Sequence, residues 1–141
     1  TTVIDSNGNR SERALLKGKY KELPNNPRRS DGELHEYCPP IHVDSEMENL
    51  LKWYHEYKQE DPVIVAAWLH HRFTQIHPYQ DGNGRLARVL ITIVLASHDL
   101  LPVVIEREDR TRYIEALEQA DRGDLAPFAQ ILANLERDAI M

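Results

Sequence analysis

Apolar residues recur at the three- and four-residue spacing of amphipathic helices over much of the chain. The pattern predicts one helix from Ser45, which forms a capping box with Glu48, to about Tyr57. It predicts a second helix from Asp61-Pro62 to about Ile76, because a proline two residues later disfavours helix just before it. The residues expected to face the core are Met47, Leu50, Leu51, Tyr54 and Tyr57 in the first helix and Val65, Leu69, Phe73 and Ile76 in the second.

The second half of the chain carries three further helical patterns. Residues 86–96 are apolar on nearly every side, which is typical of a buried central helix. After an extended segment at 100–105, we expect Asp109 to cap a helix that Gly123 stops, and Asp124 to cap the last helix. The core-facing positions there are Tyr113, Ala116, Leu117 and Ala120, followed by Leu125, Phe128, Ile131, Leu132 and Leu135.

The N-terminal third is less regular. Residues 1–10 are polar and are expected to be a lead-in or linker, and Ser11–Lys17 to form a short helix. The segment 24–40 holds several prolines, an Asp-Gly turn signal and a strand-like run at Glu33–Tyr37, which is typical of a β-hairpin. A plain surface connection fits the same residues. Together the patterns predict an all-α bundle of about six helices with a short β-hairpin, forming a single domain over residues 11–140.

Composition limits what this domain contacts. A chain of 141 residues with 41% apolar content is expected to be one globular domain, and its net charge of −6 argues against broad nucleic-acid binding. Cys38 is the sole cysteine, so no internal disulfide is expected. We therefore expect a cytoplasmic, reducing location. No secretory signal opens the sequence, and the most apolar run, Val89–Ala96, is far too short to span a bilayer, so no membrane partner is expected.

On this acidic chain, residues 77–88 form a local basic and glycine-rich stretch. Gly82-Asn83-Gly84 permits positive φ directly before a predicted helix, whose free N–H groups and positive dipole end would face a ligand on the turn. Such a turn most often binds phosphate. Arg85 and Arg88 would project from one side of the helix, where guanidinium groups clamp phosphate oxygens. A bound anion would also offset the cost of placing the Arg88 charge at the head of a buried helix.

His77 and Asp81 lie just before this turn and supply acid–base chemistry to it. A neutral imidazole can take a proton from a hydroxyl nucleophile near pH 7. Asp81 is expected to cap the helix, to hold Mg²⁺ beside substrate phosphates, or to do both. His70 and His71 are more simply structural, and a zinc site formed by them with His77 lacks the i, i+4 spacing of paired ligands on one helix. The stretch therefore predicts a phosphate-handling active site with its own base.

The full string at 77–88, His-Pro-Tyr-x-Asp-Gly-Asn-Gly-Arg-x-x-Arg, resembles the signature of the Fic (filamentation induced by cAMP) family, which usually has Phe where Tyr79 stands. The resemblance extends over about residues 15–130. It includes a Gly-x-Tyr opening, a Pro-Pro before a helix, and a histidine-bearing helix that ends in Ile-His-Pro. It also includes an Arg-x-x-Tyr-x-x-x-Leu helix at Arg110–Leu117.

This resemblance implies a helical protein adenylyltransferase, an enzyme that moves AMP from ATP onto a Tyr, Thr or Ser hydroxyl of a target protein and releases pyrophosphate. His77 would then be the general base, and Asp81 would bind Mg²⁺. The roles implied for the other positions are the anion-binding turn for Gly82, Asn83 and Gly84, the grip on the β- and γ-phosphates for Arg85 and Arg88, and contact with the adenine for Tyr113.

The resemblance also implies how the domain meets its partners. The hairpin-like segment falls where family members have a flap, and the target protein would add its backbone to this flap near Arg28–Tyr37. Many members carry an inhibitory Ser/Thr-x-x-x-Glu-Gly/Asn helix, which this sequence lacks. The glutamate would come from a separate or flanking element, or control would lie elsewhere. Two alternatives stay open: a Fic-fold transferase that moves another nucleotide or a phosphate, and a regulatory module that senses nucleotide without catalysis.

Overall fold

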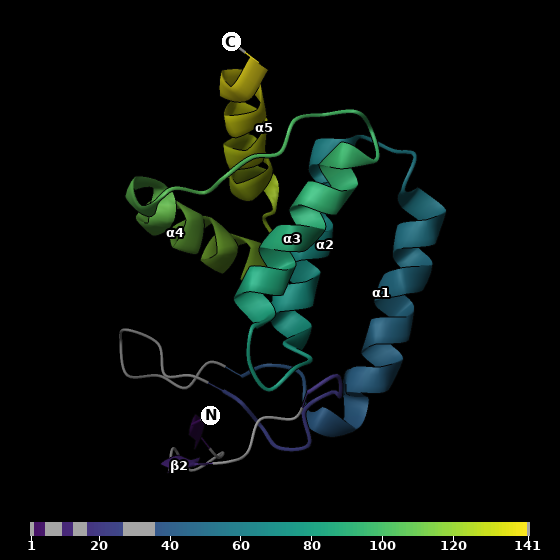
Figure 1. Ribbon diagram of the computed structural model, residues 1–141, viewed down its shortest axis with the longest axis vertical. Coiled ribbons are helices and arrows are strands. Elements are labelled where there is room, and N and C mark those ends of the chain that lie inside the picture. The colour runs from purple at the N-terminus through teal and green to yellow at the C-terminus, as the bar shows by residue number, and fades with distance from the viewer. Residues whose placement is uncertain (1, 5–9, 13–16, 27–35, 141) are drawn as a thin grey trace.

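The computed structural model describes residues 2–4, 10–12, 17–26 and 36–140, and this part of the chain is mostly helical (Figure 1). Single 3₁₀ turns, η1 (Pro40–His42) and η2 (Arg107–Asp109), directly precede the helices that begin at Val43 and Arg110. None of the described helices combines the length and the apolar character needed to cross a membrane. The mostly helical fold predicted from the sequence is confirmed. The described elements are β1 (Thr2–Ile4), β2 (Arg10–Glu12), α1 (Val43–Tyr57), α2 (Pro62–Ile76), α3 (Asn83–Ala96), α4 (Arg110–Asp121) and α5 (Ala126–Ile140).

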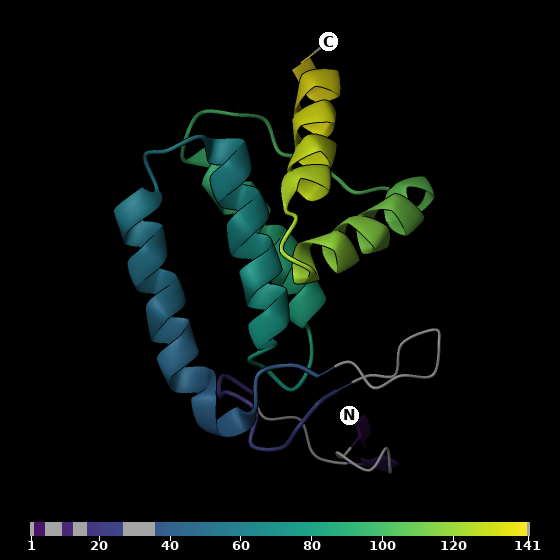
Figure 2. The ribbon, with the colours of Figure 1, turned by 180° about the vertical axis from the view of Figure 1, so that it is seen from behind.

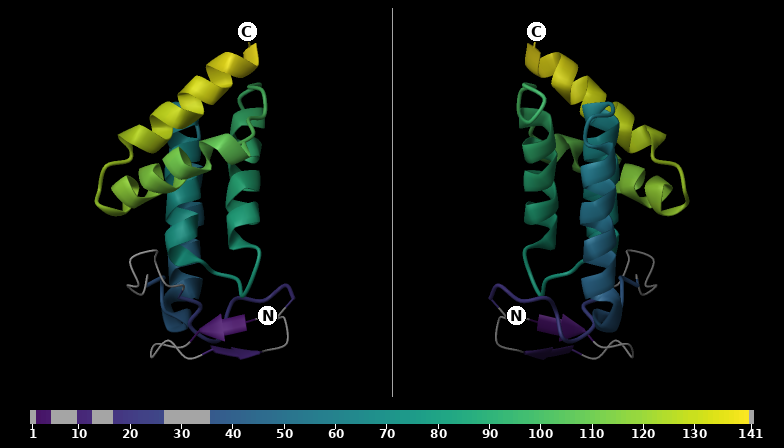
Figure 3. Two further views of the ribbon diagram at one scale, coloured as in Figure 1. Left: turned by 90° about the vertical axis from the view of Figure 1, so that its left-hand side faces the viewer. Right: turned by 90° about the vertical axis from the view of Figure 1, so that its right-hand side faces the viewer.

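The helices α2 and α3 form an antiparallel pair at the centre of the bundle, joined by a short loop at one end (Figure 1, Figure 3). α1 packs against α2, and α5 packs against both α2 and α4. Seen from behind, α1 and α2 lie in front of α3, and α4 runs out to the right of this pair below α5 (Figure 2). The loop at residues 77–82 therefore lies at one end of the central pair, where the Lys21 N–H donates to the Pro78 carbonyl over 2.8 Å.

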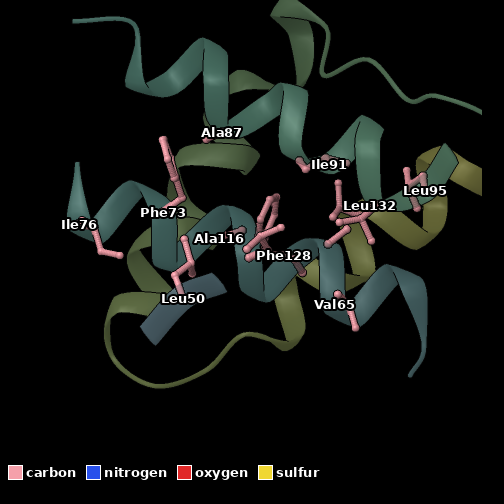
Figure 4. Close-up of a cluster of buried hydrophobic side chains, with 14 of the residues drawn as sticks. Leu50, Val65, Phe73, Ile76, Ala87, Ile91, Leu95, Ala116, Phe128 and Leu132 are labelled. Atoms are coloured by element: carbon pink, nitrogen blue, oxygen red, sulfur yellow. The ribbon is translucent and has the colours of Figure 1, made fainter. Parts of the chain in front are cut away.

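Each of the five α-helices in the described part of the chain contributes side chains to one hydrophobic core (Figure 4). Phe128 and Leu132 of α5 are fully buried and pack among residues of α2 and α3. The predicted apolar stripe of α2 is confirmed, because all four of its residues are buried. The helix pair that carries the loop is thus firmly anchored. The four residues of the α2 stripe are Val65, Leu69, Phe73 and Ile76.

The helix α1 begins earlier and buries a narrower stripe than the sequence pattern predicted. It starts at Val43, and Ser45 lies inside the helix with its Oγ donating to the His42 carbonyl over 3.1 Å, so the capping box is wrong. Leu51 and Tyr57 were expected to face the core but are 52% and 40% exposed. The reason is that α1 packs against one helix, α2, so a single narrow face is covered.

The prediction that the helix at 86–96 is buried all round is also wrong. Val89 and Ile93 are 49% and 52% exposed, and Arg88 is exposed as well. α3 has its extensive contact with α2 on one side only, so the opposite side faces solvent. The charge of Arg88 is therefore hydrated, and no argument from a buried charge applies to it. The buried residues of α3 are Asn83, Ala87, Ile91, Val94 and Leu95.

The N-terminal segment contains strands where a lead-in and a helix were expected. Thr2–Ile4 pairs antiparallel with Arg10–Glu12, in a register that places Thr2 opposite Glu12. The helix predicted for Ser11–Lys17 is therefore wrong at its first two residues; residues 13–16 lie outside the described part of the chain. Valine and isoleucine in β1 favour an extended strand. The pairing of β1 with Arg10–Glu12 holds these later residues in a strand, whereas their own pattern predicted a helix. The strand predicted at Glu33–Tyr37 falls mostly outside the described residues.

Two of the three predicted aspartate caps, Asp61 and Asp124, make the expected hydrogen bonds. Asp61 caps α2: its Oδ1 accepts from the N–H groups of Val63 at 2.9 Å and Ile64 at 3.4 Å. Asp124 likewise accepts from Ala126 N–H at 3.2 Å, before α5. Asp109 is the N-cap residue of α4, as expected, but its side chain makes no capping hydrogen bond; its Oδ1 pairs with Arg112 at 2.6 Å.

Candidate functional site

The candidate base, His77, is the first residue after α2. Its backbone is left-handed, with φ 49° and ψ 58°, while its N–H still donates to the Phe73 carbonyl over 2.9 Å. That conformation costs a non-glycine residue about 1–2 kcal/mol, so surrounding contacts must hold it. The half-buried imidazole stacks on the ring of Tyr37, with centroids 3.8 Å apart and planes within 5°. The loop thus presents one histidine in a defined pose.

The side chain of Asn83 closes the loop. Its Oδ1 accepts from the Tyr79 N–H at 2.9 Å and its Nδ2 donates to the Tyr79 carbonyl at 2.7 Å. Asn83 is buried, so both polar ends of the amide find their partners inside the protein. The family resemblance implied that Asn83 is part of the anion-binding turn. In the structure, its side chain also joins the backbone of Tyr79 to the start of α3 through two hydrogen bonds.

A second set of contacts to the loop comes from Lys21 and Asn25, which the sequence analysis did not single out. Lys21 is 4% exposed, and its Nζ donates to Asn25 Oδ1 at 2.8 Å and to the Ile76 carbonyl at 3.4 Å. Burial lowers the pKa of the Lys21 ammonium from 10.5 to about 8. Asn25 Nδ2 donates to the Tyr79 carbonyl at 2.9 Å. These partners are more than fifty residues apart in sequence, so no local pattern marks them.

The turn before α3 leaves its helix end open. Gly82 is the N-terminal cap residue with φ 81°, a left-handed conformation that glycine adopts without strain. The helical ladder begins with Leu86 N–H, which donates to the Gly82 carbonyl over 3.0 Å. The N–H groups of residues 83–85 precede this ladder and carry the positive end of the helix dipole. The geometry therefore matches an anion-binding helix N-terminus.

Both candidate phosphate-binding arginines fold back over this turn. A Cβ built on Gly82 would lie 3.5 Å from Nη2 of Arg85, and one on Gly84 would lie 3.4 Å from Nη1 of Arg88. Both side chains are exposed. Within the described part of the chain, no carboxylate forms an ion pair with either guanidinium. Two hydrated cations thus meet at the open end of α3.

Asp81 belongs to the same turn but does not cap the helix. Its Oδ1 accepts from the Gly82 N–H at 2.8 Å, and the carboxylate is exposed. Gly82 occupies the capping position, so the helix-cap alternative for Asp81 is wrong. The described residues contain no group of three His, Cys, Asp or Glu side chains that would hold a metal by themselves. A lone carboxylate suits Mg²⁺, which is commonly bound through one carboxylate and substrate phosphates.

Two hollows open beside the arginines and share Arg88. One, of about 370 Å³, lies against η2 and α4, and its lining includes Arg107, Arg110 and Tyr113. The other, of about 320 Å³, runs along the exposed side of α3, and its lining includes Arg85, Val89 and Val104. Arg88 therefore connects the anion-binding turn to a concave surface that carries Tyr113.

The tyrosine in this hollow is fixed by a buried histidine. Tyr113 Oη lies 2.6 Å from His70 Nε2. Burial raises the pKa of the Tyr113 hydroxyl, and Arg88 opposes the rise through its charge and a hydrogen bond. Burial also lowers the pKa of His70 from 6.5 to about 4, so this imidazole is neutral at pH 7. His71 Nε2 lies 2.8 Å from Asp121 Oδ1. Both histidines thus connect α2 to α4, the structural role expected of them.

The predicted flap, residues 24–40, is described at its two ends, whereas residues 27–35 lie outside the described part. Asn26 Oδ1 accepts from the Tyr37 N–H at 2.9 Å, which brings these ends together. Cys38 N–H donates to the Gln75 carbonyl over 3.1 Å and fastens the segment to α2. Because Tyr37 also stacks on His77, the C-terminal end of this segment lies directly beside the candidate base.

Comparison with known proteins gives a consistent family match. A sequence model described as the Fic/DOC family matches residues 7–95. A relative from Nematostella vectensis, named protein adenylyltransferase Fic, is 43% identical over 72 residues, which is 51% of this chain and 17% of that protein. Only a small part of the curated relative is therefore matched.

Solved structures share the fold. A Fic domain-containing signaling protein from Bacteroides thetaiotaomicron superposes with a TM-score of 0.83 at 32% identity, over 88% of this chain and 53% of that one. Fic-1 from Caenorhabditis elegans superposes with a TM-score of 0.69 at 30% identity, over 73% of this chain and 32% of the other. The chain thus spans about half of the first of these two structures and about a third of the second.

Proposed function

Because the chain belongs to the Fic/DOC family and resembles proteins named adenylyltransferases, we propose that it transfers AMP from ATP to a Tyr, Thr or Ser hydroxyl of a target protein. Pyrophosphate is the leaving group. The observation that carries the proposal is that two guanidinium groups, for which the described residues supply no carboxylate partner, lie over the open N-terminus of α3, directly after the loop that holds His77. Phosphoryl-type transfer depends mainly on positioning and on stabilising charge, and this loop offers both.

The triphosphate is proposed to sit on the turn before α3. The N–H groups of Asn83, Gly84 and Arg85 point outward from the helix start, and the absence of a side chain on Gly82 and Gly84 leaves room for close approach. Arg85 and Arg88 would hold the β- and γ-phosphates and neutralise the departing pyrophosphate. Two like charges near one helix end repel each other modestly in water, and a polyanion would offset that repulsion.

The adenosine part of the nucleotide is proposed to extend into the hollow at α4. This hollow shares Arg88 with the phosphate turn, and Tyr113 offers an aromatic edge to the base. Because His70 fixes the Tyr113 hydroxyl at 2.6 Å, the ring would meet the ligand in one orientation. This arrangement supports the role of Tyr113 that the family resemblance implied.

His77 is proposed as the general base. It would take the proton of the target hydroxyl, whose oxygen then attacks the α-phosphorus while the bond from that phosphorus to the bridging oxygen of pyrophosphate breaks. The stacked Tyr37 ring covers one face of the imidazole and leaves it little freedom to turn. An imidazole suits this step because its ordinary pKa lies close to neutral pH.

Mg²⁺ fits the single exposed carboxylate of Asp81, which the described residues do not surround with further metal ligands. Asp81 would hold the ion together with phosphate oxygens of the nucleotide. When bound, the ion would supply positive charge to the triphosphate. The hydrogen bond from Gly82 N–H to Asp81 Oδ1 fixes the carboxylate beside the turn where those phosphates would lie.

The target protein is proposed to dock on the flap, residues 24–40, near Arg28–Tyr37. Support comes from the ends of this segment: Asn26 and Tyr37 are joined, and Tyr37 lies against His77. A peptide added along such a segment would bring its hydroxyl toward the base. A separate or flanking inhibitory element with a glutamate for Arg88 remains part of the proposal, as does a cytoplasmic location.

The test is transfer of label from ATP to proteins of a cell lysate. With Mg²⁺ and ATP labelled in the α-phosphate, the wild-type chain should label target proteins, whereas His77→Asn should not. Asparagine is the better substitution here because it tolerates the left-handed backbone that His77 adopts. Equal labelling by both proteins would defeat the proposal.

Two further comparisons separate the alternatives. Label from the γ-phosphate, or from another nucleoside triphosphate, would indicate a Fic-fold transferase that moves a different group. ATP binding in calorimetry by both wild type and His77→Asn, with no transfer by either, would favour a regulatory nucleotide sensor. The transferase is preferred because a sensor has no use for a fixed imidazole beside its phosphate turn.

A further inference from the structure

The backbone at residues 76–79 has an unusual property: each of its four successive carbonyl groups accepts a hydrogen bond from a short segment near the N-terminus. The Ile76 carbonyl accepts from Lys21 Nζ at 3.4 Å, and the Pro78 carbonyl accepts from the Lys21 N–H at 2.8 Å. The carbonyls of His77 and Tyr79 accept from Asn25 Nδ2 at 3.4 and 2.9 Å. Two residues thus bind the whole backbone on both sides of His77.

We propose that Lys21 and Asn25 are positioning residues, which hold His77 in its left-handed conformation and so fix its imidazole for proton transfer. This inference rests on the proposed role of His77 as the general base. The left-handed backbone of His77 costs about 1–2 kcal/mol. The hydrogen bonds that Lys21 and Asn25 donate to the four carbonyls, here called the carbonyl cradle, compensate for this cost. Without the cradle the loop would relax and move the imidazole relative to its substrate.

Burial supports this role for Lys21. Its side chain is 4% exposed, yet it lies close to no carboxylate in the described part of the chain that would form an ion pair with it. A buried ammonium needs acceptors, and the acceptors present are Asn25 Oδ1 at 2.8 Å and the Ile76 carbonyl. The ammonium also lies 6.0 Å from the centre of the Tyr37 ring, which stacks on His77. Lys21 thus contacts both the backbone and the covering ring of the base.

The phosphate side of the loop is held by other residues. The Tyr79 carbonyl accepts from Asn25 at 2.9 Å and also from Asn83 at 2.7 Å, so the Tyr79 peptide is the junction between two sets of contacts. On one side Lys21 and Asn25 brace His77; on the other Asn83 ties the loop to α3, which carries Arg85. Loss of the first set should therefore disturb the base and leave nucleotide binding in place.

The kinetic test uses Lys21→Met and Asn25→Asp in the AMP-transfer assay. Methionine keeps the length and removes the charge and the side-chain donors, while the backbone bond from residue 21 to the Pro78 carbonyl stays. Aspartate keeps an acceptor for Lys21 and loses the donor to the His77 and Tyr79 carbonyls. Each variant should lower kcat at least about tenfold, while KM for ATP stays within about twofold. Lys21→Arg, which keeps charge and donors, should recover most of the rate. Lys19→Met, an exposed lysine two residues away, should behave as wild type.

A second readout does not depend on activity. The face-to-face stack of His77 on Tyr37 at 3.8 Å should shift the imidazole proton resonances upfield, and the spectrum of His77→Asn identifies them. In Lys21→Met and Asn25→Asp this shift should shrink, while Lys19→Met preserves it. Unchanged resonances together with unchanged kcat would overturn the inference, as would a rise in KM for ATP equal to the loss in kcat. If the wild type transfers nothing, the proposed function fails and the resonances alone decide the positioning claim. If Lys21→Met does not fold, Asn25→Asp carries both readouts.

Discussion

Asn83→Ala is the substitution whose effect on stability the structure defines most closely. It removes two hydrogen bonds, one from the Tyr79 N–H at 2.9 Å and one to the Tyr79 carbonyl at 2.7 Å. The Tyr79 carbonyl keeps its hydrogen bond from Asn25, so losing the bond from Asn83 costs about 0.5–1 kcal/mol. The N–H is left without this acceptor inside the protein, which costs about 1–3 kcal/mol. We therefore expect Asn83→Ala to lower the free energy of unfolding by about 2 kcal/mol.

Urea unfolding followed by circular dichroism measures this loss, with an unchanged dependence on urea showing that the same two states are compared. Asn83→Asp keeps the acceptor for the Tyr79 N–H but places a charged oxygen against the Tyr79 carbonyl at a buried position, so it should destabilise the protein at least as much as Asn83→Ala. Asn49→Ala, at an exposed site on α1, is the matched control and should stay within about 0.5 kcal/mol of wild type. If Asn83→Ala is as stable as Asn49→Ala, the amide does not hold the loop and the reasoning is refuted.

Three further substitutions test other parts of the site. Arg88→Ala should weaken ATP binding at least about tenfold in calorimetry, and it should leave the unfolding midpoint unchanged because the side chain is exposed. Arg137 is an exposed arginine in α5, and Arg137→Ala should change neither quantity. Equal effects of the two substitutions on ATP binding would contradict the account. Gly82→Ala should lower the free energy of unfolding by about 1 kcal/mol in urea, because φ is 81°, and wild-type stability would show that the turn needs no left-handed residue. Burial lowers the pKa of His70 from 6.5 to about 4, so the folded state binds fewer protons between these values and the free energy of unfolding should fall as pH drops from 6.5 to 4, by up to about 3 kcal/mol. His70→Gln lacks this component, so parallel stability profiles of wild type and variant across that range would contradict it.

The features predictable from sequence are those fixed by neighbouring residues. Asp61 and the proline after it define the start of α2, and Pro78 ends it, so the bounds of that helix were predicted closely. The left-handed glycine before α3 follows equally from a local signal, the Gly-Asn-Gly turn. The stretch that carries the candidate site was identified for the same reason, because its histidine, aspartate and arginines lie within twelve residues.

The features that sequence missed depend on distant contacts. Lys21 and Asn25 meet the loop more than fifty residues away, so nothing beside them in the chain marks either as part of the site. Val89 and Ile93 show the converse: their apolar character indicated burial, but no described helix covers that side of α3. A hydrophobic pattern shows which faces can be buried, and only the packing of the helices decides which faces are.

The central claim is that His77 activates a hydroxyl for attack on the α-phosphate of ATP, and the product itself tests it most directly. Lysate proteins incubated with the chain, ATP and Mg²⁺ can be digested and searched by mass spectrometry for AMP on individual side chains. The account predicts AMP on Tyr, Thr or Ser residues after incubation with wild type, and none with His77→Asn. Adducts of equal abundance with both proteins, or none with a wild-type chain that binds ATP, would contradict it.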